Sequence, residues 1–452
     1  MSATTTAPSP YLAGNFAPVG DELTAFDLPV TGTIPAGLDG RLLRIGPNPV
    51  VAEDPTTYHW FTGTGMAHGL RLSHGKAQWY RNRFVRSDRV TNAKGWPAVT
   101  GPRHGPGDGT ANTNLIGHAG RTLAIVEAGG LPVELDDELE TVARTDFAGT
   151  LPGGFSAHPK LDPHTGELHA VAYYWKWDHL QYMVVGTDGR VRRTVDVAVP
   201  DGPMVHDMAL TATNVVLLDL PVTFDLAAAM GGRSLPYRWD PDHRARVGLL
   251  PRDGTAADVT WCDVEPCYVF HILNAYDHDD KVVIDVVRHP RMFATDLLGP
   301  NEGSPTLERW TLDPASGQAR EERLDDHAQE FPRLDERRSG SPYRYGYAVG
   351  VRDGIEHGPA LKHDLVAGTT EVHDYGRGRA TLEPVFVPRS AAAAEDDGWV
   401  LSYVYDATTD TSDVVILAAQ DFAGDPVATI HLPRRVPFGF HGNWVPTPQQ
   451  VV

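Results

Sequence analysis

The sequence predicts an all-β protein, a single large closed fold of the propeller or barrel type. Short runs of β-branched and aromatic residues alternate with Gly, Asp, Asn and Pro along the whole chain, as strands alternate with turns. The 45 glycines and 36 prolines favour many turns over long helices. No linker divides the 452 residues into two folding units. Because no sequence repeat marks individual blades, both a propeller and a barrel remain open on the residues alone.

The expected strands follow one another along the chain. They lie within residues 68–85, 120–136, 167–199, 214–224, 282–290 and 398–419. Tight hairpin connections are expected at HGK (74–76), DPHTGE (162–167) and TDGR (187–190). Short helices are expected at FDLAAAMGG (224–232) and at the alanine run 391–394. Residues 1–9 are expected to be a disordered lead-in, and residues 10–452 to form one domain.

Charge and cysteine content exclude several classes of function. The chain has 39 Lys+Arg against 59 Asp+Glu, a formal charge of -20, which repels nucleic-acid phosphates and anionic lipids. The N-terminus MSATTTAPSP has no secretory signal pattern, and no run of 18 apolar residues could span a membrane. The only cysteines, Cys262 and Cys267, indicate a reduced, cytoplasmic protein. No obligate protein partner is evident.

Four of the 20 histidines share a local setting. His158, His206, His271 and His441 each follow small or apolar residues and are far apart in the chain. This separation excludes a local HExxH or finger-type zinc site. It suits a metal centre that takes one ligand from each of several strands meeting at an axis. On spacing alone, the alternative remains that these are buried or surface histidines with satisfied hydrogen bonds.

Eight segments resemble the signature segments of the carotenoid cleavage oxygenase family. They occur in the order of that family and cover nearly the whole chain from about residue 10. The segments are GRLLRIGPNPV (40–50), YHWFTGTGMAHGL (58–70), SAHPKLDPHTGELHAVAYYW (156–175), PMVHDMALT (203–211), EPCYVFHILNAYD (265–277), QEFPRLDER (329–337), EPVFVPR (383–389) and PFGFHGNW (437–444). Within the family, the chain is most similar to compact bacterial carotenoid and apocarotenoid oxygenases. The resemblance implies a seven-bladed β-propeller with iron on its axis and a dome of loops and short helices above it.

The resemblance also implies a metal site and its chemistry. His158, His206, His271 and His441 would bind Fe(II), and Glu127, Glu330 and Glu383 would accept the other ring N–H of three of them. Such carboxylates fix the tautomer and orientation of each imidazole. The reaction would add O2 across an alkene and release two carbonyl products without an organic cofactor. An all-imidazole site also accommodates zinc or copper, so ligand type does not decide the metal.

Further residues are implied around the iron. Thr113 matches the family position whose methyl group crowds one vacant iron site; the alternative is an ordinary strand threonine. An aromatic and apolar wall suits a conjugated polyene. The candidates for this wall, each of which could instead be plain core, are Phe61, Val126, Trp175, Met204, Phe270, Phe293 and Phe438.

The residue before Glu127 bears on the substrate. Relatives that cleave lignostilbene typically carry a lysine there, which binds the phenolate, whereas this chain has Val126. Valine cannot ionise, so an apolar carotenoid or apocarotenoid is favoured over a stilbene or phenylpropanoid alkene. Segment 221–239 lies where relatives carry a membrane-dipping patch but is only mildly apolar, which predicts peripheral membrane contact at most.

Two interpretations from other classes compete with this one. A propeller can serve as a non-catalytic binding platform, because fold does not fix function. Such a scaffold has no need of four histidines and three glutamates. A propeller hydrolase or lactonase would use calcium or zinc, but calcium sites favour carboxylate and carbonyl oxygens, which the histidine motifs do not supply.

Overall fold

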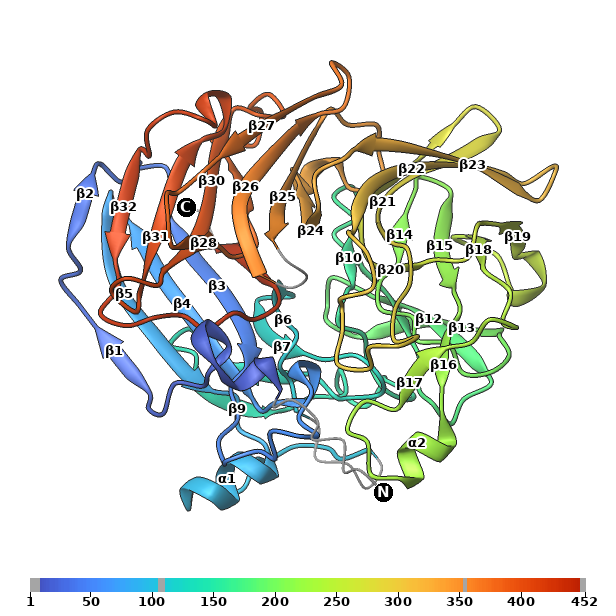
Figure 1. The fold of residues 1–452 in the computed structure, drawn as a ribbon, viewed down its shortest axis with the longest axis horizontal. Coiled ribbons are helices and arrows are strands. Elements are labelled where there is room, and N and C mark those ends of the chain that lie inside the picture. The colour runs from blue at the N-terminus through green and yellow to red at the C-terminus, as the bar shows by residue number, and fades with distance from the viewer. Residues whose placement is uncertain (1–8, 105–109, 353–355, 448–452) are drawn as a thin grey trace, which may run out of the picture.

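A ring of β-sheets around a central axis forms the body of the protein (Figure 1). The computed structural model describes residues 9–104, 110–352 and 356–447. Helices are few among these residues: α1 (Asp88–Lys94), α2 (Leu226–Met230) and single 3₁₀ turns at Pro10–Leu12, Gly14–Phe16, Trp60–Thr62, Ala256–Asp258, Glu336–Arg338 and Ala419–Asp421. The fold is all-β and propeller-like, as the sequence predicted. The expected lead-in lies outside the described residues except for Ser9, which is buried.

Antiparallel sheets fill the first part of the ring. One has the order β1-β5-β4-β3-β33, with β1 (Leu23–Ala25), β3 (Gly40–Pro47), β4 (Gly65–Ser73), β5 (Lys76–Phe84) and β33 (Gly442–Pro446). The next contains β6 (Asn114–His118), β7 (Arg121–Ile125), β8 (Val133–Leu135) and β9 (Thr141–Arg144). A third contains β10 (Lys160–Leu161), β11 (Leu168–Ala172), β12 (His179–Val185) and β13 (Val191–Ala198).

The second part of the ring begins with an eight-stranded sheet. It contains β14 (Ala209–Leu210), β15 (Asn214–Asp219), β18 (Arg246–Pro251), β19 (Thr260–Asp263), β20 (Tyr268–His278), β21 (Lys281–His289), β22 (Thr306–Asp313) and β23 (Gln318–Asp325). A separate two-stranded sheet is formed by β16 (Val222–Phe224) and β17 (Tyr237–Trp239). The next sheet contains β24 (Gln329–Leu334), β25 (Tyr345–Arg352), β26 (Glu356–Asp364) and β27 (Thr369–His373). The last contains β2 (Val30–Gly32), β28 (Arg379–Thr381), β29 (Val385–Pro388), β30 (Gly398–Asp406), β31 (Thr411–Ala418) and β32 (Ala428–His431).

The expectation of seven separate blades differs from the hydrogen-bonded sheets. Within the described residues, the strand sets β14-β15-β18-β19 and β20-β21-β22-β23 belong to one sheet rather than two. They are joined only by a parallel pairing of Asp263 with Gln318, at the meeting of β19 and β23. A single bridge between two otherwise antiparallel meanders is the reason for the difference.

Each end of the described chain adds a strand to a sheet that is otherwise formed by the opposite end. The C-terminal strand β33 pairs antiparallel with β3, from Gly40↔Pro446 to Arg44↔Gly442. The N-terminal strand β2 pairs antiparallel with β32, from Val30↔Ile430 to Gly32↔Ala428. This exchange closes the ring and covers strand edges that would otherwise be exposed. It also fixes His441, which immediately precedes β33.

The predicted turns and helices are only partly confirmed. His74 and Gly75 between β4 and β5 have φ of 51° and 69°, as a two-residue type I′ turn requires. Helix α2 lies within the predicted segment 224–232. The prediction of a helix at 391–394 is wrong, because these residues form turns. The Arg337 guanidinium donates to the carbonyls of Ser390, Ala391, Ala393 and Ala394 over 3.0–3.3 Å, so these carbonyls are not left for helical bonds.

Helix α1 was not predicted from the sequence, although its ends carry ordinary signals. Ser87 caps its first turn by accepting from the Val90 N–H over 3.3 Å. Gly95, with φ of 67°, ends it in the left-handed conformation. The helix is short, and this explains why hydrophobic periodicity did not reveal it.

We expect the Asp285→Ala substitution to destabilise the propeller by about 3–5 kcal/mol, because it breaks a buried ion pair. The fully buried Asp285 carboxylate accepts from Arg309 Nε and Nη2 over 2.7 and 2.8 Å and from the Tyr343 hydroxyl over 2.6 Å. The midpoint of urea denaturation measures the effect. Arg344→Ala, which breaks a solvent-exposed pair with Asp364, is the control and should cost below about 1 kcal/mol. Equal midpoints for the two variants would contradict this prediction.

Candidate metal centre

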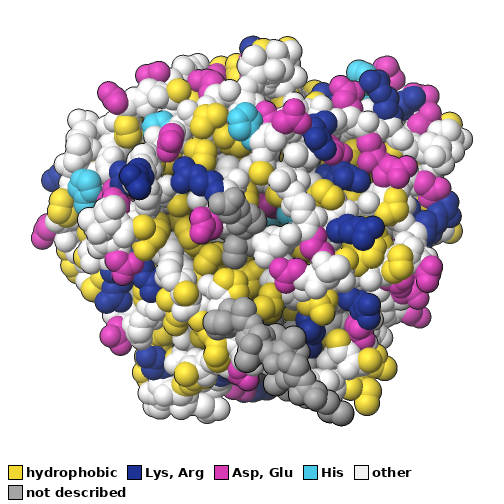
Figure 2. Space-filling model, viewed as in Figure 1, with side chains coloured by type: hydrophobic (Ala, Val, Ile, Leu, Met, Phe, Trp, Pro, Cys, Tyr) yellow, Lys and Arg dark blue, Asp and Glu magenta, His cyan; other side chains and the backbone are white. Residues whose placement is uncertain are grey.

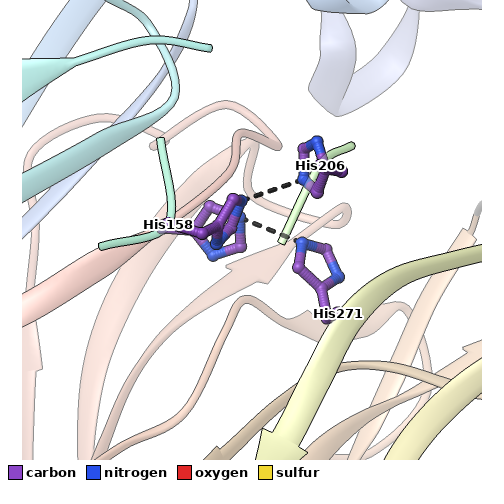
Figure 3. A group of neighbouring side chains, drawn as sticks. His158, His206 and His271 are labelled. Carbon is purple, nitrogen blue, oxygen red and sulfur yellow. Dashed lines mark hydrogen bonds between the residues drawn. The ribbon is translucent and has the colours of Figure 1, made fainter. Parts of the chain in front are cut away.

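Four histidines from four places in the ring converge on one point. His158 and His206 lie in loops just before β10 and β14, His271 lies within β20, and His441 immediately precedes β33. All four side chains are buried, and one ring nitrogen from each lies within 4.8 Å of the others. Figure 3 shows the rings of His158, His206 and His271 turned toward one another from separate segments. The widely spaced histidines of the sequence are therefore brought together.

The spacing of the ring nitrogens fits a shared cation. Nε2 of His158 lies 2.9 Å from Nε2 of His206, and Nε2 of His271 lies 3.1 Å from that of His441. Two nitrogens bound at right angles to a metal at about 2.1 Å would lie about 3.0 Å apart. His271 and His441 each direct Nδ1 at a carboxylate, so in the neutral ring, the form that binds a metal, Nδ1 carries the proton and Nε2 carries a lone pair. Two lone pairs this close repel each other unless a cation lies between them.

Three glutamates hold three of these imidazoles from behind. Nδ1 of His206 donates to Glu127 Oε2 over 2.9 Å, and Nδ1 of His441 donates to Glu383 Oε1 over 2.8 Å. Nδ1 of His271 donates to Glu330 Oε2. Each contact fixes the tautomer that turns Nε2 to the shared point. His158 is the exception: among the described residues its ring meets no carboxylate, its ring–ring contacts are with the other three histidines, and its backbone N–H donates to Ser156 Oγ over 3.2 Å.

The local electrostatics keep the Glu383 carboxylate charged and favour the neutral form of His158 and His441, whereas the pKa of His271 is raised because Glu330 outweighs the opposing effect of burial. Burial alone would raise the pKa of the Glu383 carboxyl, but the charge of Arg333 and the contact with His441 lower it to about 2. Burial, with the nearby His206, holds the pKa of His158 well below its usual value. Burial also lowers the pKa of His441, to about 4, against the opposing effect of Glu383. Neutral imidazole is the form that binds a metal.

The sequence did not reveal what holds the three carboxylates. The Tyr173 hydroxyl donates to Glu127 Oε2 over 2.9 Å, and His289 Nε2 lies 2.6 Å from Glu330 Oε1. Arg333 Nη1 lies 3.1 Å from Glu383 Oε2, which also accepts from the Gly442 N–H over 2.8 Å. Arg333 stands in the same QEFPR segment as Glu330, a signal that could have found it. Tyr173 likewise stands in the segment 156–175 that contains His158, whereas His289 carries no such signal.

A cavity lies beside the histidine cluster. Of the residues predicted to line it, Phe61, Val126 and Phe270 do so. Thr113 lines it too: its hydroxyl donates to Asn112 Oδ1 over 2.8 Å, and its carbonyl accepts from the His441 N–H over 3.1 Å. Lining residues that the sequence did not indicate include Trp60, Pro300, Pro305, Phe331, Val351, His357 and Phe440.

Four of the residues predicted to line the cavity lie elsewhere among the described residues. Trp175 is 38% exposed and stacks on Phe224 at 4.8 Å, and Met204 is buried in the core. Phe293 packs at 5.9 Å from His59, and Phe438 packs behind His357, at 4.5 Å. Proximity in sequence to a motif did not indicate which way these side chains point, because neighbouring residues of an extended chain face opposite sides.

Comparisons with known proteins agree with this geometry. A family model described as retinal pigment epithelial membrane protein matches residues 16–446. A Mycobacterium tuberculosis protein named carotenoid cleavage oxygenase is 48% identical over 97% of this chain and 98% of its own length. The crystal structure of Pseudomonas brassicacearum lignostilbene dioxygenase matches with a TM-score of 0.89 and 31% identity, covering 97% of this chain and 98% of that one. A cobalt-substituted Synechocystis apocarotenoid oxygenase matches with a TM-score of 0.85 and 28% identity, covering 95% and 97%.

Proposed function

The chain belongs to the carotenoid cleavage oxygenase family, and on that premise we propose that it is an iron(II) dioxygenase that cleaves a C=C bond of a carotenoid or apocarotenoid with O2. The products are two carbonyl compounds. The observation that carries this proposal is the convergence of four buried imidazoles beside a cavity walled by Phe61, Val126 and Phe270. A non-catalytic platform would have no use for such a cluster.

Iron(II) is the proposed metal, held by His158, His206, His271 and His441. The donor set supports a borderline cation but does not by itself select iron over zinc or copper. The similar Synechocystis structure is of a cobalt-substituted protein, which supports a metal in that relative. When bound, iron supplies the oxygen chemistry of the cleavage reaction. The three carboxylates supply the opposing charge and fix the ligand orientation.

The chain's other residues position the alkene. The cavity wall excludes water and orients one double bond toward the four imidazoles. We propose that Thr113 restricts the space beside the ligands. Its hydroxyl is turned to Asn112, and its carbonyl holds the His441 backbone, both of which support this role.

We also propose that residues 10–452 form one seven-bladed propeller under a dome of loops. The support is positional. Thr113, His158, His206, His271, Glu330, Glu383 and His441 each lie within a few residues of the start of a different strand: β6, β10, β14, β20, β24, β29 and β33 respectively. These strands belong to seven successive strand groups around the ring when the eight-stranded sheet is divided at its single parallel bridge. Cavity residues such as Pro300 and Pro305, which lie outside the strands, support a dome.

An apolar polyene is the proposed substrate, and a stilbene or phenylpropanoid alkene is the second candidate, which the similarity to a lignostilbene dioxygenase favours. Val126 lines the cavity directly before Glu127 and cannot bind a phenolate. We expect the purified protein to cleave a carotenoid or an apocarotenal under O2 and to leave resveratrol uncut. Val126→Lys should lower kcat/KM for the polyene at least about tenfold, because an unpaired buried ammonium is costly. Cleavage of resveratrol alone would refute the argument from Val126.

The protein is proposed to be cytoplasmic and to contact membranes only peripherally. Cys262 and Cys267 are both free and buried, as in a reduced compartment. No helix among the described residues is long and apolar enough to cross a membrane. Figure 2 shows Asp and Glu interspersed with Lys and Arg over the face viewed, with hydrophobic side chains between them. Leu226 and Met230 of α2 are 58% and 83% exposed, a small apolar contact at most. Stable pelleting with neutral liposomes in the absence of detergent would overturn this part of the proposal.

A further inference from the structure

A histidine outside the metal cluster lies in the wall of the cavity. His357, in β26, is 5% exposed and lines the same cavity as His206, His271 and His441. Its ring is packed between Phe438, at 4.5 Å, and Phe331, at 5.4 Å. Its Nδ1 lies 3.0 Å from the carbonyl oxygen of Thr381. These three contacts hold the imidazole in one orientation.

The partner of Nδ1 determines what the other ring nitrogen can do. A carbonyl oxygen can only accept a hydrogen bond, so Nδ1 of His357 carries the proton. Burial, together with the charge of Arg44, lowers the pKa of His357 to about 3, so the ring is neutral at physiological pH. Nε2 therefore carries a lone pair. Among the described residues the His357 ring makes its hydrogen bond through Nδ1 and none through Nε2.

Other polar groups in the cavity wall take part in internal hydrogen bonds or cannot accept one. Glu127, Glu330 and His289 belong to the network behind the ligands. The Thr113 hydroxyl donates to Asn112. Trp60 Nε1 has no hydrogen-bond partner in the part of the chain that the structure describes, but it is a buried donor and cannot accept. His357 is thus an acceptor that belongs to no internal network.

The position of His357 determines how far a group bound to it lies from the alkene bond that is cleaved. The Phe331 ring lies 5.2 Å from His271, 5.5 Å from His441 and 5.4 Å from His357. One phenyl ring therefore separates the metal ligands from His357. A substrate group that donates to Nε2 would therefore be close to the alkene beside the metal cluster. Only one ring and a few carbon atoms of the substrate would separate the two.

We propose that His357 accepts a hydrogen bond from a hydroxyl group on the terminal ring of the substrate, so that the preferred substrate is a ring-hydroxylated alkene cut near its hydroxylated end. This inference rests on the proposed function and specifies its substrate class. Two sources present the same chemistry: the alcohol of a hydroxylated polyene ring and the hydroxyl of a phenol. His357 is a specificity-determining residue in this scheme and takes no part in bond cleavage.

The test compares substrates that differ only by the hydroxyl. Zeaxanthin is paired with β-carotene, and 4-hydroxystilbene with stilbene. We expect iron-loaded wild type to favour the hydroxylated member of one pair by about 10–100-fold in kcat/KM, because the other member leaves a buried acceptor unpaired. His357→Leu should abolish that preference, chiefly by slowing the hydroxylated substrate. His357→Gln, which keeps an acceptor at similar reach, should restore part of it.

His373→Leu is the matched control. His373 is also a buried histidine whose Nδ1 lies 3.0 Å from a backbone carbonyl, that of Phe422, but it does not line the cavity. This variant carries the same loss of a buried imidazole and should keep the wild-type preference. Circular dichroism and iron content of each variant show whether the protein is folded and loaded.

The possible outcomes are distinct. A preference that His357→Leu removes and His373→Leu retains supports the inference, and the substrate pair that shows it identifies the source of the hydroxyl. Equal wild-type rates within both pairs, or a preference that survives His357→Leu, overturns the inference while the proposed function stands. If no substrate is cleaved, the proposed function fails, and the dissociation constants of the same pairs, measured by quenching of tryptophan fluorescence, decide the inference in the same way.

Discussion

Replacing His441 or His206 with alanine is expected to remove bound iron and abolish turnover while leaving the propeller largely intact. Each imidazole supplies one of four nitrogen ligands and stands against a carboxylate that serves no other histidine of the cluster. Alanine offers no ligand atom to the metal. It also removes the imidazole N–H from which that carboxylate accepts a hydrogen bond. Metal content by elemental analysis, circular dichroism and aldehyde products by mass spectrometry measure the three effects.

His169→Ala provides the matched control for the ligand variants. His169 is a buried histidine in β11 that contacts Tyr182 and Arg252 rather than the metal cluster. Its loss should leave iron content and turnover close to the wild type. A His441 or His206 variant that kept full iron and full turnover would remove that residue from the ligand set.

Glu383→Gln is expected to weaken iron retention or activity by about 10–100-fold, the usual effect of losing a carboxylate behind a metal-binding histidine. The carboxylate accepts at once from His441, the Gly442 N–H and Arg333. A glutamine amide has one oxygen for these donors, and its NH2 group must face at least one of them. Either the tautomer of His441 is then no longer fixed, or the carboxamide loses its hydrogen bond to Arg333 or to the Gly442 N–H. Iron content after dialysis against a chelator, with kcat/KM, measures the loss.

Glu336→Gln separates this effect from a general disturbance of Arg333. Glu336 contacts the same guanidinium, at 2.9 Å, but its side chain is 55% exposed and does not touch a histidine of the cluster. This variant should keep its iron and its activity. Unchanged behaviour of Glu383→Gln would show that the carboxylate does not support the metal site.

The sequence predicted the class of fold because strand and turn signals are local. The hairpin at His74 and Gly75 is such a case, since two residues determine it. The alanine run at 391–394 failed for the opposite reason: Arg337, remote in sequence, binds its carbonyls. The bridge between Asp263 and Gln318, which merges two meanders, is likewise a tertiary contact that no local pattern signals.

In the candidate site, too, some residues are indicated by the local sequence and others only by tertiary contacts. The four histidines could be selected from 20 because each lies in a segment that resembles a known family; their wide spacing alone left the choice open. Phe270 was found through its neighbour His271 in such a segment, and Val126 through its position directly before Glu127. His289 and His357 enter the site from strand ends brought near by ring closure and blade packing, and only the assembled fold reveals them.

Metal content and product identity, measured on the same protein, test the proposed dioxygenase most directly. The protein is purified in air, reconstituted with Fe(II) and offered a carotenoid, an apocarotenal and resveratrol under O2, with aldehydes identified by mass spectrometry. One equivalent of iron per chain together with polyene-derived aldehydes is the expected result, and the masses locate the cut. A protein that binds no metal and releases no aldehyde would contradict the proposal and favour a binding platform.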